Sequence, residues 1–381
     1  RSLKPGGGWE DPFLNGLDTE LAAEGIASSR LTYLDITGFE AEVARRKGYL
    51  LPAILWWSFG GYLRALTALP PALPSDSKLS GLPVGRLLER EWWQDFARAG
   101  RCAYLFFFDC VENLLSKSSF KAVAMPWEAQ PQERMLVLAA QRAGVRCVGY
   151  QHTTVPEFQL PFYSTAEEYR NSPTPDILVT SGEHPASVLR SAGFPAQRLR
   201  MGGTRRYGHF LKDGAFPRPS LGPDVLIMLP VDAWQARHLI AAVARAYPDG
   251  LPEGRFLLRP HPSGPEDVRR TPFPSELAEG PMNEALSRCG VVVFSGSTAG
   301  LDALCAGHPV LRYRPSLLLD MEPTDMFPED FLPNASDSDL RERLEALRRS
   351  PPPLPEEAIR RKLKEVFSPL DKPVWKEALL S

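Results

Sequence analysis

VVVFSGSTAGLDALCAGHP, residues 291–309, is the stretch that says most about how this 381-residue chain folds. Its first four residues are apolar and mostly β-branched, which predicts a buried strand. The strand ends in the small polar turn Ser295 to Thr298, and apolar spacing then predicts a helix from Ala299 to Ala306. A second strand follows from Pro309 to Tyr313. This succession of strand, helix and strand is typical of a parallel sheet covered by helices.

The same alternation occurs in two series along the chain. A joint rich in Pro and Gly, residues 214–223, separates the two series. In the first series we predict strands at 101–108, 120–125, 146–150, 176–180 and 198–201, with helices at 132–143 and 183–192. In the second series we predict strands at 224–229, 255–258, 291–294 and 309–313, with helices at 233–247, 283–288 and 299–306. Two such series predict an α/β protein with two Rossmann-like domains that face each other across a cleft.

The predicted domain organisation has three parts. We place the first domain at residues 1–213, the second at residues 214–355, and C-terminal helices at residues 356–381 that cross back to the first domain. Ligands of doubly wound sheets bind outside the carboxyl ends of the strands. The first candidates for a site are therefore the polar residues at the predicted strand ends: Asp109, Glu128, His152, Gly202, Gly203, Asp232, His261 and Ser295 to Thr298.

Composition and charge exclude several classes of function. Hydrophobic residues make up 43% of the chain and charged residues 24%, and the net charge is −2, so nothing indicates a nucleic-acid partner. The five cysteines form no CxxC pair, which is typical of free thiols in a reducing compartment. No secretory signal opens the sequence. We therefore expect a cytoplasmic protein.

The sequence does not indicate a metal or a cofactor. Its six histidines form no HxxxH pair and no cluster with cysteine. The one DxD, Asp337 to Asp339, directly precedes a predicted helix at residues 340–348, so we expect it to cap that helix. We expect neither a metal nor a cofactor to be required.

The longest uncharged stretch is YLLPAILWWSFGGY, residues 49–62. It is shorter than the roughly 18 to 20 residues that span a bilayer, and Pro52 interrupts it. Two interpretations stay open. The stretch is either a buried or interdomain segment, or an interfacial surface that brings the protein to the inner face of the cytoplasmic membrane and to a lipid-linked acceptor.

The turn Ser295 to Thr298 has the properties of a phosphate cradle. The first turn of a helix has unpaired N–H groups and a partial positive charge, Ser297 and Thr298 add hydroxyl groups, and Gly296 lets a ligand approach the backbone. A well-capped helix is the alternative reading. Residues 296–300 (GSTAG) match the GxSxG pattern of hydrolases, but Thr298 stands at the nucleophile position, which argues against an esterase.

A second anion-binding element is FLLRPHP, residues 256–262. The predicted strand delivers Arg259 and His261 to its carboxyl end, and the two prolines keep this exit extended. A cation and an imidazole at this place can bind a phosphate and stabilise it as it leaves. A loop in which His261 only bonds backbone is the alternative.

Together, His261-Pro262 and the Ser-Gly-Ser-Thr turn give the chain a resemblance to a known family. The pair resembles the GT-B glycosyltransferases that use CMP-activated acidic sugars, such as bacterial sialyltransferases and Kdo transferases. The first domain is similar to surface-carbohydrate biosynthesis proteins at residues 126–133 (PWEAQPQE) and 149–156 (GYQHTTVP). The resemblance covers roughly residues 100–315 and implies a GT-B fold. Its donor motif is more specific for the fold than for CMP or Kdo.

The resemblance also implies roles for individual residues. His261, Ser297 and Thr298 would bind the donor phosphate, and Asp302 would bond the ribose unless it is a solvated helix carboxylate. Arg205 and Arg206 follow Gly202-Gly203 near the domain joint, and both have the chemistry to bind an anionic sugar carboxylate, although a solvated loop is the competing reading. The complete set of predicted donor-binding residues is Arg259, His261, Ser295, Gly296, Ser297, Thr298, Asp302, Gly203 and Arg205.

Three residues are candidates for catalysis. Asp232 follows the first strand of the second domain, where it either attacks the anomeric carbon or caps the helix that begins at Ala233. Glu128 lies beside Trp127, whose apolar ring would raise the carboxyl pKa, and we expect it to be the general acid/base. His152 is the alternative, because its intrinsic pKa suits the role. A retaining double displacement needs two carboxylates on opposite sides of the sugar, which Asp232 and Glu128 would supply.

The resemblance implies transfer of an acidic sugar, Kdo first and sialic acid second, from a CMP donor to a surface glycan or lipid-linked glycan. Two other functions stay open. One is the transfer of a polyol phosphate from CDP-glycerol, and the other is a non-catalytic subunit that binds a sugar nucleotide or a glycan.

Overall fold

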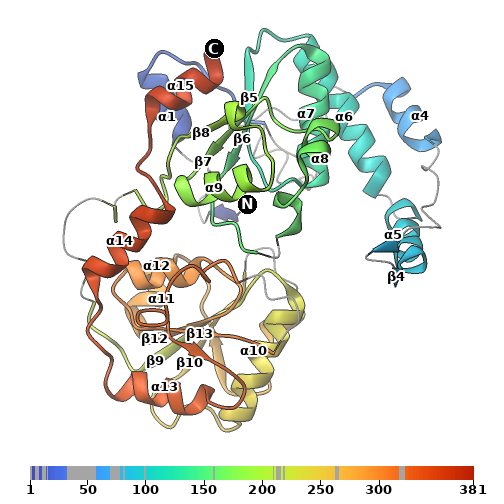
Figure 1. Cartoon of the computed structure of the whole chain (residues 1–381). Coiled ribbons are helices and arrows are strands. Elements are labelled where there is room, and N and C mark those ends of the chain that lie inside the picture. Colours follow the sequence, from blue (N-terminus) through green and yellow to red (C-terminus); the bar gives the residue numbers. More distant parts are fainter. Residues whose placement is uncertain are drawn as a thin grey trace.

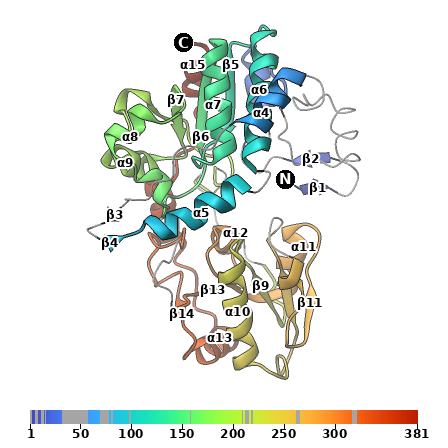
Figure 2. The same ribbon diagram turned by 90° about the vertical axis from the view of Figure 1, so that its right-hand side faces the viewer.

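The computed structural model describes two lobes, one stacked on the other (Figures 1 and 2). The first domain forms the upper lobe in Figure 1 and the second domain the lower lobe. The residues described are 2–4, 8–10, 14, 16–31, 57–68, 78–79, 82–97, 100–157, 159–208, 210–211, 216–217, 219–261, 266–316 and 322–381. The predicted boundary between residues 213 and 214 lies outside them.

A six-stranded parallel sheet forms the centre of the second domain. Its order is β11-β10-β9-β12-β13-β14, so that the strands, counted along the domain, lie in the order 3-2-1-4-5-6. This is the order of doubly wound dinucleotide-binding folds, in which the ligand crevice lies where the order reverses. That point is the gap between the carboxyl ends of β9 and β12. The strands are β9 (Asp224–Met228), β10 (Phe256–Arg259), β11 (Ser275–Leu277), β12 (Cys289–Phe294), β13 (Val310–Tyr313) and β14 (Asn334–Ala335).

Helices cover both faces of this sheet, which is why its central strands are almost continuously apolar. In β9 successive side chains alternate between two cores: Val225 and Ile227 pack with Leu239 of α10, whereas Leu226 packs with Leu301 of α12. The helices are α10 (Ala233–Ala246), α11 (Met282–Arg288), α12 (Ala299–Cys305) and α13 (Leu340–Arg349).

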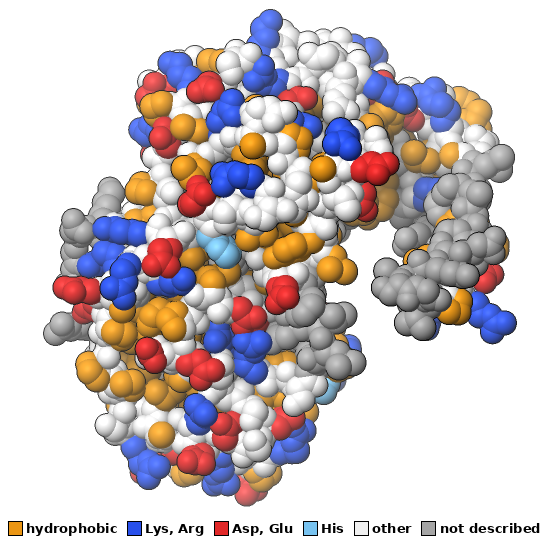
Figure 3. Space-filling view, viewed as in Figure 1, with side chains coloured by type: hydrophobic (Ala, Val, Ile, Leu, Met, Phe, Trp, Pro, Cys, Tyr) orange, Lys and Arg blue, Asp and Glu red, His pale blue; other side chains and the backbone are white. Residues whose placement is uncertain are grey.

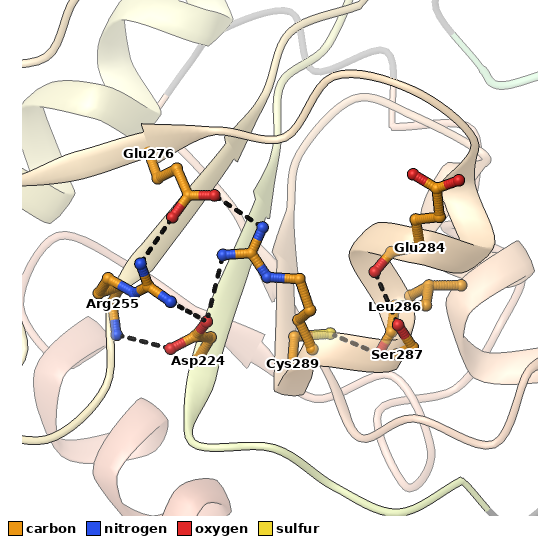
Figure 4. Close-up of polar contacts among 8 residues, drawn as sticks. Asp224, Arg255, Glu276, Glu284, Leu286, Ser287 and Cys289 are labelled. Atoms are coloured by element: carbon orange, nitrogen blue, oxygen red, sulfur yellow. Dashed lines mark hydrogen bonds and ion pairs between the residues drawn. The ribbon is translucent and has the colours of Figure 1, made fainter.

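A charged network ties the strands together at the end of the sheet opposite the switch point (Figure 4). The buried Asp224 accepts a bond of 2.9 Å from the Arg255 backbone N–H and lies 3.7 Å from an Arg288 nitrogen. Glu276 bonds both arginines, at 2.9 Å from Arg255 and 2.7 Å from Arg288. The network joins the amino ends of four neighbouring strands, at the edge of the sheet away from the predicted ligand site.

The first domain contains a four-stranded parallel sheet in the order β5-β6-β7-β8. Helices α6 and α7 pack on one face, and α15 on the other. The helix α7 begins after a Gln130 whose backbone N–H bonds the Glu133 carboxylate, and it is followed by Gly144 in the left-handed conformation that ends helices. The elements are β5 (Ala122–Pro126), β6 (Arg146–Gln151), β7 (Ile177–Thr180), β8 (Leu199–Met201), α6 (Gly100–Ser116), α7 (Pro131–Ala143), α8 (Ala166–Asn171) and α9 (Glu183–Ser191).

The predicted strand at residues 101–108 is wrong, because α6 occupies this region. Its buried apolar residues are Phe107, Cys110, Val111, Leu114 and Leu115, which follow the spacing of a helix rather than a strand. The apolar run alone suits either structure, and the continuation of the pattern past residue 108 distinguishes them. Asp109 therefore lies within a helix, not at a strand end, and pairs with Arg64 at 2.8 Å.

Two chain segments cross between the domains side by side. The helix α14 (Glu356–Val366) packs on the second domain, and the chain then returns to the first, where α15 (Lys372–Leu380) lies against the sheet. The Trp375 indole donates to the Gly202 carbonyl at 3.1 Å. The first of these segments follows β8 and contains Thr204, and the second follows α14 and contains Ser368; they are called the first and second crossing below. The Thr204 backbone N–H donates to the Ser368 carbonyl at 2.8 Å, and this bond joins the two crossings.

The N-terminal part adds an arm to the first domain. Its helices are α1 (Leu17–Ala23), α4 (Phe59–Thr67) and α5 (Gly85–Ala97), and its short strands are β1 (Ser2–Lys4), β2 (Gly8–Glu10), β3 (Lys78–Leu79) and β4 (Leu82–Pro83). Figure 3 shows that the α4–α5 arm stands away from the second domain. Of the uncharged stretch at 49–62, residues 49–56 lie outside the described part of the chain. Within the described residues, no helix is both long and apolar enough to cross a membrane.

Candidate functional site

The loops after β9 and β12 touch at the switch point of the second domain. Gly296 has a φ of +55°, which favours glycine. A Cβ at this position would lie 2.1 Å from the Gln235 side-chain oxygen and 3.2 Å from Cβ of Pro230. Asp232 caps α10 by accepting the Gln235 backbone N–H at 2.8 Å, and its side chain is exposed beside the same contact. The sheet order therefore places Asp232 and the Ser-Gly-Ser-Thr turn at one edge.

The polar groups of the turn already have intramolecular partners. Ser295 is buried, and the Ser297 hydroxyl accepts the Ala299 N–H at 3.2 Å. Thr298 begins α12, and its hydroxyl accepts a bond of 3.0 Å from Arg206. The N-cap residue Thr298 makes no side-chain capping bond to α12, and the bond from the first helical N–H goes to Ser297 instead.

Glu322 is a buried carboxylate against this turn, and the sequence analysis missed it. It is 1% exposed, and one of its oxygens accepts the Gly296 N–H at 2.7 Å. The other oxygen accepts the N–H and the hydroxyl of Thr324, at 3.1 and 2.6 Å. Burial raises the pKa of Glu322 to about 7, although these bonds and the nearby Arg312 favour the charged form. Two acids in the otherwise apolar sequence LLLDMEP, residues 317–323, were the only signal available.

Arg206, predicted together with Arg205 to reach an anionic sugar carboxylate, contacts this turn. Its guanidinium binds both oxygens of Asp302, with Nε 3.1 Å from one and Nη2 in contact with the other. It also donates to Thr298. Asp302, which was predicted to bond a ribose, thus forms an ion pair with an arginine of the first crossing between the domains.

Arg259 and His261 leave the carboxyl end of β10, next to β9. Arg259 donates to the carbonyls of Ala278 and Gly280, both at 3.0 Å, which fixes the chain after β11. Burial lowers the pKa of His261, and the positive charge of Arg206 lowers it further. His261 is therefore mainly neutral at pH 7. It lies close enough to Arg206 for the arginine's positive charge to lower its pKa.

The first domain brings Glu128 and His152 together at the ends of two neighbouring strands. Nε2 of His152 lies 3.5 Å from a carboxylate oxygen of Glu128. His152 is buried, whereas the Glu128 side chain is 38% exposed. Burial raises the pKa of Glu128, in the direction expected beside the buried Trp127. A carboxylate and an imidazole in contact are groups that can act in general acid/base catalysis.

One contact links this pair to the second domain. The Thr154 hydroxyl, two residues after His152, donates to the Pro323 carbonyl at 2.6 Å. Pro323 directly follows Glu322, which bonds Gly296. The segment 149–156 of the first domain and the turn after β12 are therefore joined through residues 322–324.

Gly203 and Arg205 lie at the crossing between the domains. Gly203 has a φ of +73°, and a Cβ there would lie 1.9 Å from the Pro369 carbonyl oxygen, so its local role is to let the two crossings pack. Arg205 donates to the Gly16 carbonyl at 2.9 Å and lies 3.5 Å from Glu20. The described contacts of Arg205 are thus with the N-terminal arm, and its predicted role toward the donor stays a prediction.

The aspartates of the DxD sequence are engaged in other interactions. Asp337 accepts the Tyr313 hydroxyl at 2.7 Å and pairs with Arg245 at 2.5 Å. Asp339 stands at the start of α13 and accepts the Ser336 N–H at 2.6 Å. Among the described residues, no group of three or more His, Cys, Asp or Glu side chains is arranged to hold a metal ion.

Comparison with known proteins agrees with this architecture. No protein-family model matches the chain, and no curated protein matches it in sequence. Among solved structures, the glycotransferase of kitacinnamycin matches 95% of this chain and 94% of its own, with a TM-score of 0.50 and 13% identity. Anabaena HepE in complex with UDP-glucose has a TM-score of 0.47 and 11% identity, over 100% of this chain and 93% of its own. Arabidopsis thaliana UGT89C1 complexed with UDP-L-rhamnose has a TM-score of 0.46 and 12% identity, over 92% and 89%.

Identities this low establish the fold alone. A parallel-sheet first domain and a doubly wound second domain, joined by paired crossings and matched over nearly the whole chain by a GT-B structure, make up a GT-B fold. The predicted fold class is confirmed.

Proposed function

We propose that this protein is a glycosyltransferase that binds a nucleotide-activated sugar at the switch point of its second domain. The observation that carries this proposal is the contact between the loops after β9 and β12, where Gly296 packs against Gln235. Doubly wound sheets bind nucleotides at this point. The hydroxyl of Thr298 and the guanidinium of Arg206 lie at the same edge and suit a phosphate.

For the donor, we propose a CMP-activated acidic sugar, with Kdo before sialic acid. The support is the sequence pair of His261-Pro262 with the Ser-Gly-Ser-Thr turn. The GT-B fold itself does not select the base, because a fold hosts many functions. Parallel titrations of the parent protein with CMP and with UDP decide between them: tighter binding of UDP would overturn the CMP proposal without affecting glycosyl transfer.

For the chemistry, we propose that Glu128 is the general acid/base, with His152 as its partner. Burial raises the pKa of Glu128 towards neutral pH. A general acid/base acts best when its pKa lies near the working pH. Asp232 would be the nucleophile of a retaining reaction. Its capping bond to Gln235 fixes its side chain at the switch point, and its attack would form a glycosyl-enzyme bond as the nucleotide leaves.

Substitution of the two carboxylates tests this assignment. We expect Glu128→Gln and Asp232→Asn each to lower turnover by about 100-fold or more, because general acid–base groups typically contribute 10²–10⁴-fold. Nucleotide affinity, measured by calorimetry, should stay within about twofold. Glu377→Gln, which removes a surface carboxylate paired with Arg200, is the matched control. Full activity in both variants would contradict the assignment.

The same assay separates the alternative functions. Transfer from CDP-glycerol would give a product heavier by a glycerol phosphate, which mass spectrometry identifies. A non-catalytic subunit would bind a nucleotide but turn over none of the donors tested.

We also propose that α4 helps the enzyme reach a lipid-linked acceptor at a membrane surface. The support is its apolar exposed face: the side chains of Phe59, Leu63 and Leu66 are 70%, 48% and 51% exposed. They are spaced at i, i+4 and i+7 and so share one face of the helix.

A further inference from the structure

The main chain of Arg206 is fixed on both sides. Two residues before it, Thr204 bonds Ser368 of the second crossing. One residue after it, the buried Tyr207 stacks on Phe367 at 4.4 Å between ring centroids, and its hydroxyl lies 3.4 Å from the Thr298 carbonyl oxygen. The main chain of Arg206 is therefore held in place within the first crossing, and its side chain extends from there to the turn after β12.

The side chain of Arg206 is held by its bonds, but these do not involve all of its N–H groups. Its bonds to Asp302 and Thr298 involve three of the five N–H groups of a guanidinium. Within the described contacts, one N–H on each terminal nitrogen is left for a ligand oxygen. The side chain as a whole is 29% exposed.

The engagement of Asp302 also bears on its role. Both of its carboxylate oxygens accept bonds from Arg206. A carboxylate in such a bidentate pair sets the plane and direction of the guanidinium. The geometry of Asp302 therefore suits a residue that positions the Arg206 guanidinium better than a residue that binds a ribose hydroxyl.

We propose that Arg206 binds the donor phosphate at this turn, and that Asp302 is its positioning residue rather than a ribose ligand. This inference rests on the proposed function, since it concerns the same nucleotide site. It assigns phosphate recognition to a residue between the domains, in addition to the loops of the second domain.

The test compares nucleotides with nucleosides. The probes are CMP and cytidine, and UDP and uridine, titrated against the parent, Arg206→Met and Asp302→Asn. For the nucleotide that the parent binds more tightly, we expect Arg206→Met to weaken binding by about 10- to 100-fold. Binding of the matching nucleoside should change by less than about twofold, because it has no phosphate. Asp302→Asn should show the same pattern with a smaller loss.

Controls separate a misfolded variant from a specific loss. Arg245→Met removes another arginine–aspartate pair of the second domain, away from the turn, and should bind nucleotide as the parent does. Unchanged nucleoside binding in Arg206→Met also shows that the site is folded.

The possible results have distinct meanings. If the parent binds neither nucleotide, the proposed function falls and this inference falls with it. If the parent binds a nucleotide and Arg206→Met binds it within twofold, only the inference is wrong. An equal loss of nucleotide and nucleoside in Asp302→Asn would make Asp302 a ribose ligand and overturn its positioning role.

Discussion

Glu322 places a negative charge where the proposed function needs to attract an anion. Its carboxylate accepts the Gly296 N–H, a backbone donor that a phosphate cradle would present to its ligand. Because its pKa is raised to about 7, the group is largely neutral below that pH and charged above it. The protonation state of one buried side chain therefore affects how strongly the turn attracts a phosphate.

This property predicts a pH dependence of nucleotide binding. Glu322→Gln keeps an oxygen for the Gly296 N–H but cannot ionise. At pH 8 we expect the variant to bind CMP or UDP about 5- to 10-fold more tightly than the parent, because a charge–charge repulsion is removed. At pH 6 the two proteins should bind alike.

Calorimetry across this pH range checks the prediction. Protonation of His261 and of the nucleotide phosphate also occurs below pH 7, but it is common to both proteins, so only their difference reports Glu322. A constant ratio of affinities from pH 6 to pH 8 would contradict the role of Glu322.

At the residue scale, the sequence could predict the turn but not its partners. Small hydroxyl residues between a strand and a helix identify Ser295 to Thr298 without any knowledge of the rest of the fold. Glu322 and Arg206 reach that turn from 24 or more residues away in the chain, and nothing in local spacing shows this. Asp302 was identified as a site residue, but its partner could only be seen in three dimensions.

At the scale of elements, α4 has two faces with different partners. Gly61 and Ala65 are buried, and a Cβ at Gly61 would lie 2.9 Å from the Asp109 side chain of α6. Phe59, Leu63 and Leu66 lie on the exposed side. The small residues let the helix dock closely, while the large apolar residues remain in solvent.

We expect this exposed face to bind bilayers. The double variant Phe59→Ser/Leu66→Ser should bind phospholipid vesicles at least about tenfold more weakly than the parent, because each buried apolar side chain contributes roughly 1.5–3 kcal/mol. Co-sedimentation with vesicles measures the partitioning. Leu380→Ser, which changes an exposed leucine on α15, is the control. Equal sedimentation of the parent and the double variant would rule out a bilayer contact by α4.

Element prediction succeeded where one strand or helix was bounded by clear signals. The helix α7 ends at Ala143 as predicted, and the four second-domain strands that were predicted lie within one or two residues of their predicted limits. The short edge strands β11 and β14 were missed, because residues 275–277 and 334–335 carry little apolar pattern and depend on a neighbour for pairing. The helix α6 was mistaken for a strand for the opposite reason, since its apolar run is strong but fits both periods.

At the scale of the whole molecule, three contacts within the described part of the chain connect the domains near the turn after β12. The crossings are joined at Thr204 and Ser368, Arg206 extends from the first crossing to α12, and Thr154 contacts Pro323 beside Glu322. A ligand at the turn after β12 would thus contact groups whose positions depend on both domains. His152, which pairs with Glu128 and is proposed for the chemistry with it, lies in the segment that makes the third contact.

The central claim is that the donor phosphate binds at the switch point between β9 and β12. Its most direct test is a crystal structure of the protein soaked with CMP or UDP, whichever binds more tightly. We expect phosphate density within hydrogen-bond distance of the Ser297 or Thr298 hydroxyl, with His261 next to it. Nucleotide density elsewhere, for example in the depression lined by Met326, Phe331 and Arg361, would contradict the claim.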